Sequence, residues 1–371
     1  RTSALRTTMT LHSWRFRARD PRCPPDWVDT LSGDLSHGPA LRHTRVSAMY
    51  LSAQTDIPYD IMHNIMRIAG DDFGQASRRR ILQQGGLTLS SGGVWFLWTP
   101  GSTITSRPVQ ERAWRCAAFA RAREAALGRT RSANPVGVLV SETCWRRTRL
   151  DGVSDYYDGD APDHAALALQ DAACGVDITN EELLQQRQDP YRIVVVANQR
   201  TLAPATVAVL RRTVRSGGTL LVTGSGLADF EDRAEWLGAA VSEGEQTVRR
   251  LDVGENRIVT CRTSVEVAAE DARVSATFRD GSPALTVHRL GRGQVAYLAL
   301  PTLSYPDDAG VLSWTVRQLG FGPAVHVEGE SRRAHLAFSF RRKEGERILH
   351  LTDLTSAVDG RPVVPSLRND I

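Results

Sequence analysis

Two adjacent carboxylates, Asp71 and Asp72, are the first residues in this sequence that could do chemistry. They lie between Gly70 and Gly74, after a predicted strand over 57–62, and β/α-barrel enzymes carry functional loops at the carboxyl ends of their strands. Two carboxylates held on either side of a bond can act as nucleophile and as general acid/base. Adjacent side chains point in different directions, so this pair alone does not complete such a site. A solvated loop or a helix N-cap is the alternative interpretation.

Trp98 ends a run of five apolar residues, 94–98, and its indole could stack against the flat face of a sugar ring. The run is continuously apolar, which predicts a strand buried on both faces. Because strand side chains alternate, Phe96 and Trp98 belong to one face and Trp95 to the other. Trp98 is therefore a candidate for substrate binding, and a buried core tryptophan is the alternative.

His63 is a second candidate for substrate binding, because it follows the predicted strand over 57–62. Neither His63 nor His164 has a second ligand at metal-binding spacing, so no metal site is expected. The glycine-rich turns at 217–218 and 224–226 match neither a dinucleotide-binding motif nor a P-loop. We therefore expect no cofactor.

Alternating strands and helices must position these residues. From residue 135 onward, apolar runs predict buried strands at 136–140, 193–197 and 219–222, with helices at 164–173 and 205–215. Strands and helices that alternate at this spacing predict right-handed crossovers and a parallel sheet.

The flanking segments have a different character. Helices are predicted at 44–54, 75–84 and 109–127, the second ending at Gly85-Gly86. After residue 252 the pattern changes to short alternating strands, then a helix at 310–318 and a β-rich tail. The best linker candidate is 128–134, and a second boundary lies at 320–323.

The composition is that of an ordinary globular chain. With 371 residues, 41% hydrophobic and 24% charged, it has room for two or three domains. The net charge of +4 is small and scattered, which argues against nucleic acid as a partner. Five cysteines without a C-x-x-C pair indicate a reducing, cytoplasmic setting. No apolar stretch reaches about twenty residues, so no membrane span is expected. The first residues show neither a methionine nor a signal peptide, so we expect a longer protein.

Six segments carry a resemblance to a known family. Taken in order, they resemble the glycoside hydrolase family forty-two β-galactosidases and their α-L-fucosidase-like relatives. The segments are SAMYLSAQTDIPYDIMHNIMR, LTLSSGGVWFLWTPGS, VGVLVSE, YRIVVVANQRTLAPATVAVLRRTVRSGGTLLVTG, SPALTVHRLGRGQVAYLAL and ILHLTDLTS.

The resemblance implies an α/β protein of three parts. It implies a partial β/α barrel over 1–130, a flavodoxin-like domain of the class I glutamine-amidotransferase type over 135–320, and a small β domain over 323–371. In the family the middle domain mediates trimerisation. A complete barrel takes about 200 to 250 residues, so at most half of one fits before the middle domain.

The amidotransferase-like fold raises a further hypothesis, since its enzymes place a nucleophilic cysteine on the turn after a central strand. The corresponding turn here, 223–226, carries Ser225 and lacks the outer glycines of a G-x-S-x-G motif. His326 and Glu328 supply a His-x-Glu, but they alternate with valines as in an ordinary strand. We interpret the motif as coincidental and keep a Ser225 hydrolase as a third hypothesis.

The expected function is that of the C-terminal portion of a glycoside hydrolase acting on galactoside- or fucoside-type carbohydrates. This chain alone should be inactive, because half a barrel cannot position two carboxylates across a glycosidic bond. The alternative is a non-catalytic protein that oligomerises or binds carbohydrate. The expected partners are carbohydrate and further copies of the chain, with no nucleic acid and no membrane.

Overall fold

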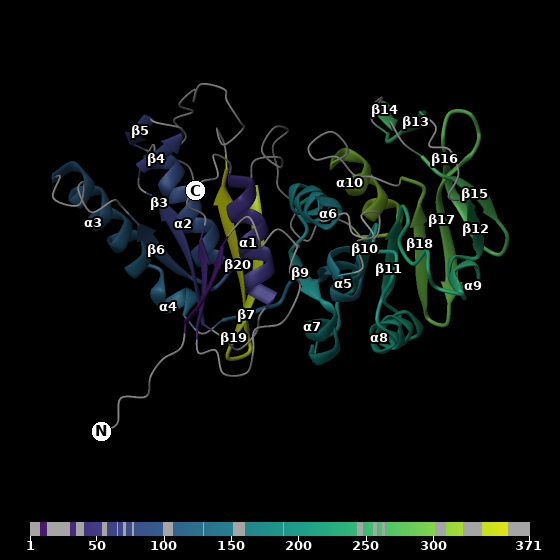
Figure 1. Ribbon diagram of the computed structural model, residues 1–371, viewed down its shortest axis with the longest axis horizontal. Coiled ribbons are helices and arrows are strands. Elements are labelled where there is room, and N and C mark those ends of the chain that lie inside the picture. Colours follow the sequence, from purple (N-terminus) through teal and green to yellow (C-terminus); the bar gives the residue numbers. More distant parts are fainter. Residues whose placement is uncertain are drawn as a thin grey trace.

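The computed structural model contains a parallel sheet and a larger, mainly parallel sheet, both flanked by helices, together with smaller antiparallel sheets (Figure 1). It describes residues 8–12, 30–34, 41–53, 58–64, 66–69, 72–75, 78–98, 107–128, 130–150, 160–187, 189–242, 248–254, 258–261, 264–300, 309–321 and 336–354.

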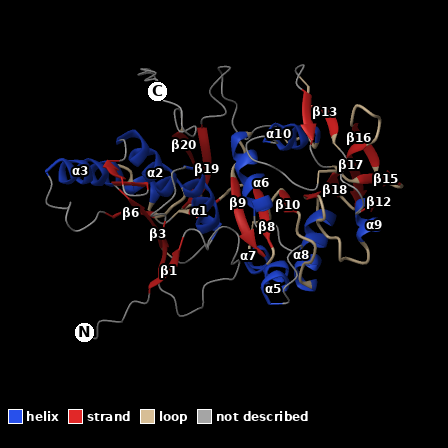
Figure 2. Ribbon diagram, turned by 45° about the horizontal axis from the view of Figure 1, so that its top comes forward, coloured by secondary structure: helices blue, strands red, loops and turns tan. Residues whose placement is uncertain are grey.

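The first sheet has four parallel strands in the order β1-β2-β3-β6. Helices α1, α2 and α3 pack on one of its faces (Figure 2), where they bury Ile61 of β3 and half-bury Trp95 of β6. The elements of this part are β1 (Thr8–His12), β2 (Thr30–Asp34), α1 (Leu41–Ala53), β3 (Tyr59–Asn64), β4 (Met66–Ala69), β5 (Asp72–Gln75), α2 (Arg78–Ser90), β6 (Val94–Trp98), α3 (Arg107–Arg121) and α4 (Glu124–Leu127).

Helix α2 continues through Gly85 and Gly86, where the sequence analysis predicted its end. A Cβ at Gly85 would lie 2.5 Å from Cε3 of Trp95, and one at Gly86 would lie 3.2 Å from Thr352 Cγ2. Glycine therefore serves close packing here and does not terminate the helix. The predicted stop at this position was wrong for that reason.

The second sheet has seven strands in the order β16-β17-β18-β11-β10-β8-β9. Strands β9, β8, β10, β11 and β18 run parallel, and β17 and β16 continue the sheet in antiparallel pairing. The strands are β8 (Val136–Val140), β9 (Val176–Asn180), β10 (Ile193–Ala197), β11 (Thr219–Thr223), β16 (Arg273–Thr277), β17 (Pro283–Leu290) and β18 (Gly293–Leu298).

Helices cover both faces of this second sheet. In both views α6 and α10 lie together on one side, and α7 and α8 lie together on the other (Figures 1 and 2). The helices are α5 (Glu142–Leu150), α6 (Asp160–Asp171), α7 (Glu181–Gln186), α8 (Pro204–Arg215), α9 (Arg233–Leu237) and α10 (Ala309–Gln318). Two short antiparallel pairs, β12 (Ala239–Ser242) with β15 (Glu266–Ala269) and β13 (Arg249–Asp252) with β14 (Ile258–Cys261), complete this part.

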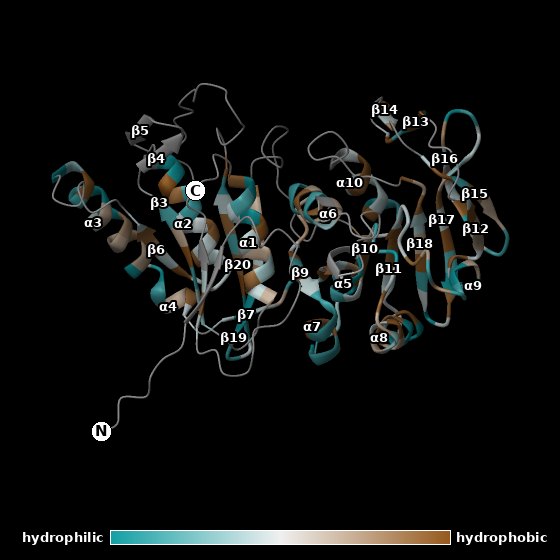
Figure 3. Ribbon diagram, in the orientation of Figure 1, coloured by the Kyte–Doolittle hydropathy of each residue, from teal (hydrophilic) through white to brown (hydrophobic). Residues whose placement is uncertain are grey.

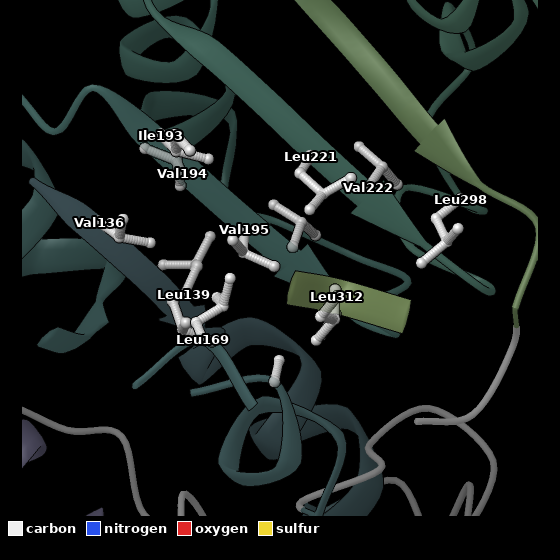
Figure 4. Close-up of a cluster of buried hydrophobic side chains, with 14 of the residues drawn as sticks. Val136, Leu139, Leu169, Ile193, Val194, Val195, Leu221, Val222, Leu298 and Leu312 are labelled. Carbon is white, nitrogen blue, oxygen red and sulfur yellow. The ribbon is translucent and has the colours of Figure 1, made fainter. Parts of the chain in front are cut away.

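The second sheet contains the main core. Every residue of β8, β9, β10 and β11 is buried, as expected for parallel strands covered on both faces. Leu169 of α6 and Leu312 of α10 point at Leu139 and Val195 of the sheet (Figure 4), and all four are less than 1% exposed. The hydropathy colouring shows the central strands as predominantly apolar (Figure 3).

A three-stranded sheet in the order β20-β19-β7 joins distant parts of the chain. It combines β19 (Leu336–Lys343) and β20 (Glu346–Asp353) with β7 (Arg131–Ser132), which precedes the second sheet. The segment 128–134, predicted to be a linker, therefore contributes a strand. Its pairing with β19 holds it in place.

Helix α1 lies between the two larger sheets (Figure 1). Its Arg45 is 5% exposed, donates from Nε to Gln170 Oε1 over 2.5 Å, and pairs through Nη2 with Asp171 Oδ1 at 2.6 Å. These contacts to α6 attach the first sheet to the second through buried polar bonds.

Candidate functional site

The face of the first sheet that points away from its helices is the candidate site. On β6, Val94, Phe96 and Trp98 are 63%, 43% and 37% exposed, while Trp95 on the other face is half-buried against α2 and α3. The strand predicted at 94–98 is present as β6, but the prediction that both of its faces are buried was wrong. β6 is the end strand of the sheet among the described residues, and its outward apolar face has no described helix over it.

Trp98 lies at the carboxyl end of β6, where ligands of parallel sheets bind. Its neighbour in register on β3 is Asn64. Two residues earlier on each strand, Met62 of β3 pairs with Phe96 of β6 on the same face. The thioether of Met62 and the ring of Phe96 therefore extend the apolar surface that ends at Trp98. Such a surface can stack against a sugar ring.

Asp60 is the one carboxylate among the described side chains of these four strands. It lies near the start of β3 and accepts a hydrogen bond from Ser32 Oγ at 2.7 Å. Partial burial raises the pKa of Asp60, and the bond from Ser32 opposes this effect. A single carboxylate at the amino end of its strand does not form a glycosidase pair.

His63 lies within β3 and on the helix-covered face of the sheet. It is 0% exposed, and its Nε2 lies 3.4 Å from Thr44 Oγ1 of α1. Burial lowers the pKa of His63 from 6.5 to about 3, so its imidazole is neutral at neutral pH. This position favours a packing role over the substrate contact that the sequence suggested.

The buried imidazole of His63 should make stability depend on pH. Below 6.5 the unfolded chain binds a proton at this position and the folded chain does not, so the free energy of unfolding falls as pH drops from 6.5 toward 3. Each pH unit costs about 1.4 kcal/mol per such group. Urea unfolding midpoints of H63Q should therefore fall less between pH 6.5 and 5 than those of the unsubstituted chain. An unchanged slope would contradict this account.

The two candidate carboxylates lie in the connection after β3. Asp71 is outside the described residues. The backbone of Asp72 begins β5 and pairs with Ala69 of β4, in a hairpin that follows β3. Their catalytic role stays a prediction.

The turn after β11 carries Ser225, whose Oγ donates to Asn198 Oδ1 at 2.7 Å. The backbone N–H of Ser225 donates to the same oxygen at 3.0 Å, and Tyr297 OH donates to Gly224 O at 2.7 Å. These bonds hold the turn against β10 and β18. His326 and Glu328 lie outside the described residues. The partner of Ser225 in this turn is an amide oxygen, which is no general base.

Asp177 of β9 is a polar centre that the sequence analysis missed. It is 0% exposed, and its carboxylate accepts hydrogen bonds from Ser52, Ser132, Asn134 and Tyr191 at 2.7–3.1 Å. Arg187 Nη1 adds an ion pair at 3.2 Å. The only signal in the sequence is the pattern of β9, where Asp177 sits between the apolar Val176 and Ile178.

Neither a metal centre nor a membrane span emerges from the described part of the chain. No group of three or more His, Cys, Asp or Glu side chains within it could hold a metal ion. Of the helices described, none is both long and apolar enough to cross a bilayer.

The described sheets and helices make this a mixed α/β protein with parallel sheets, and its fold is similar to that of solved GH42 β-galactosidases. Residues 164–312 match the family model described as the β-galactosidase trimerisation domain. This match confirms the resemblance to the glycoside hydrolase family 42 β-galactosidases that was inferred from the sequence.

Solved structures of similar fold include two β-galactosidases and an α-L-fucosidase. A cold-adapted β-galactosidase from Rahnella sp. R3 superposes with a TM-score of 0.71 at 15% identity, over 95% of this chain and 59% of that one. A GH42 β-galactosidase from G. stearothermophilus superposes with a TM-score of 0.66 at 14% identity, over 85% of this chain and 52% of that one. An α-L-fucosidase isoenzyme from Paenibacillus thiaminolyticus superposes with a TM-score of 0.65 at 16% identity, over 88% of this chain and 54% of that one. The chain therefore spans little more than half the length of these enzymes.

Proposed function

We propose that this chain forms the non-catalytic portion of a galactoside- or fucoside-active glycoside hydrolase, where it associates subunits and contributes one wall of a sugar site. The observation that carries the proposal is the match of residues 164–312 to the trimerisation domain. The relatives' names supply the substrate class, since they are β-galactosidases and an α-L-fucosidase.

The first sheet is proposed to be part of a β/α barrel over 1–130. Four parallel strands in sequential order, with α1, α2 and α3 on one face, are half of what a barrel needs. The opposite face, with Val94, Phe96 and Trp98 exposed on β6, has the apolar character of a barrel interior. An end strand with exposed aromatic residues favours pairing with a further strand.

The second sheet is proposed to be a flavodoxin-like domain of the amidotransferase type over 135–320. The order of its first strands, β11-β10-β8-β9, supports this assignment. From β8 the chain adds β9 on one side and then crosses over to add β10 and β11 on the other side, as in the flavodoxin-like strand order. The strands β19 and β20 would belong to a small β domain over 323–371. Because β7 pairs with β19, this domain would also include the residues of β7, which precede the second sheet in the chain.

We propose that Trp98 stacks against sugar and that Asp71 and Asp72 border the same region from the connection after β3. The exposure of Trp98 at a strand's carboxyl end supports this. A protein that binds carbohydrate without hydrolysing it is the second candidate function, favoured by the single described carboxylate of the sheet. A Ser225 hydrolase receives no support from the Asn198 contact.

A cytoplasmic setting remains part of the proposal. Cys116, Cys144, Cys174 and Cys261 are free and buried, and free thiols persist in reducing compartments.

The association role predicts a homotrimer. Light scattering coupled to size exclusion should give three times the mass of one chain at tens of micromolar, because the domain at 164–312 belongs to a trimerisation family. Dilution should lower the mean mass if the subunits exchange. A mass of one chain throughout this concentration range would contradict the association role and leave the fold unaffected.

A further inference from the structure

The carboxyl edge of the second sheet contains a crevice in which α/β domains hold their ligands. Strands β8 and β10 are neighbours, and their following connections leave in opposite directions, to β9 on one side and to β11 on the other. Ligands of open parallel sheets bind where the connections diverge in this way. The contents of this crevice therefore decide whether the domain can bind a ligand.

Two side chains of the protein fill the crevice. One is Gln199, which is 0% exposed, accepts from Ser141 N at 3.0 Å and donates to Ala197 O at 3.2 Å. The other is Glu181, the first residue of α7, which is 6% exposed and contacts the hydroxyl of the same Ser141. Its carboxylate is directed at the beginnings of the two helices that follow β8 and β10.

The carboxylate of Glu181 is held by neutral donors. Its Oε1 accepts from Ala203 N at 2.8 Å, immediately before α8, and its Oε2 accepts from Thr143 N at 3.1 Å, in the first turn of α5. Thr143 Oγ1 donates to Oε2 at 3.0 Å, and Ser141 Oγ lies 3.2 Å from Oε1. Backbone N–H groups at helix starts attract anions, and two such starts converge on one carboxylate here.

We propose that these donors form a carboxylate-binding cradle at the ligand crevice of the domain, and that Glu181 is its permanent internal ligand. Within the described residues no cation pairs with Glu181, so the cradle itself supplies the stabilisation of its charge. By filling the cradle, Glu181 closes the crevice to outside ligands and ties α5, α7 and α8 together. The domain keeps the shape of a ligand-binding fold and uses it as a rigid scaffold.

The surface beside Glu181 leaves a path from solvent to the cradle. A hollow of about 340 Å³ borders Glu181 and is lined by Arg146, Glu182 and Gln185 among others. Replacing Glu181 by alanine removes one methylene and the carboxylate, which is close to the size of acetate. Acetate is therefore the probe for the emptied cradle.

The test compares full-length chains with E181A, E181Q and E182A in equal concentrations of sodium acetate and sodium chloride. E182A is the matched control, because Glu182 is the adjacent residue, borders the same hollow and is exposed. We expect E181A to lower the thermal midpoint by roughly 5 °C, from unpaired buried donors, and E182A to change it little. Acetate should recover at least half of the E181A loss in a saturable manner. It should not help E181Q, whose side chain still fills the cradle.

Three results would overturn the proposal: a midpoint of E181A equal to that of E182A, no advantage of acetate over chloride for E181A, or an equal effect of acetate on all variants. If E181A is unfolded in chloride, the proposal requires acetate to restore its far-ultraviolet circular dichroism. Failure of acetate to do so would also overturn it. The oligomer mass measured on the unsubstituted chain reports on the proposed association separately.

Discussion

Replacing Asp177 by alanine is expected to lower the free energy of unfolding by about 3–5 kcal/mol, the typical cost of removing one member of a buried ion pair. Five side chains direct donors at this carboxylate, at 2.7–3.2 Å, and all of them would lose their acceptor at once. Arg187 would be left as a charge with 11% of its side chain exposed. The buried hydroxyl of Tyr191 would lose a partner as well.

The loss of Asp177 should affect several parts of the fold, because its partners come from different parts of the chain. Ser52 belongs to α1 and Ser132 to β7, while the amide of Asn134 both donates to Asp177 and accepts from Phe340 N of β19 at 2.9 Å. One carboxylate thus connects the first sheet, the second sheet and the C-terminal sheet. D177A should consequently loosen the contacts among all three parts.

Urea unfolding of D177A, D177N and D189A measures the effect. D189A is the control, because Asp189 forms a surface pair with Arg342 and is 69% exposed, and such pairs contribute about 0–1 kcal/mol. The unfolding midpoint of D177N should lie between those of D177A and the unsubstituted chain. An amide keeps one acceptor oxygen, but its N–H donors face the donors of Ser132 and Asn134. Equal midpoints for D177A and D189A would show that the network does not connect the three parts.

Much of the second sheet was predictable from its sequence. The runs at 136–140 and 193–197 are uninterrupted apolar segments, and strands buried on both faces require that composition. The helix predicted at 205–215 is α8, which begins at Pro204 as helix starts often do. In these segments the local composition predicts the same secondary structure that burial in the fold requires.

The missed elements have a shared physical cause, namely polar or small residues selected by distant contacts. β9 escaped prediction because Asp177 and Thr179 interrupt its apolar pattern, yet both are buried, and Asp177 has partners as distant in the chain as Ser52. Gly85 suggested a helix end, and only its contact with Trp95 explains its place inside α2. β7 became a strand because β19 pairs with it. No local signal carries such information.

The candidate site was predicted in part. The alternation that separates Trp98 from Trp95 is present, and the exposure of Phe96 and Trp98 was not expected because an apolar run usually indicates burial. His63 was expected at or beyond the end of a strand over 57–62, but β3 continues to Asn64, so His63 lies inside the strand. That shift turns its side chain toward α1.

The most direct test of the central claim is a turnover assay of the purified chain with aryl β-galactoside, α-fucoside and β-glucoside substrates. The account predicts no hydrolysis above that of a mock preparation, because the first sheet presents a single described carboxylate, Asp60, and a glycosidase needs two across the bond. Turnover that stays with the chain through successive purification steps and falls in D71N or D72N would contradict the account.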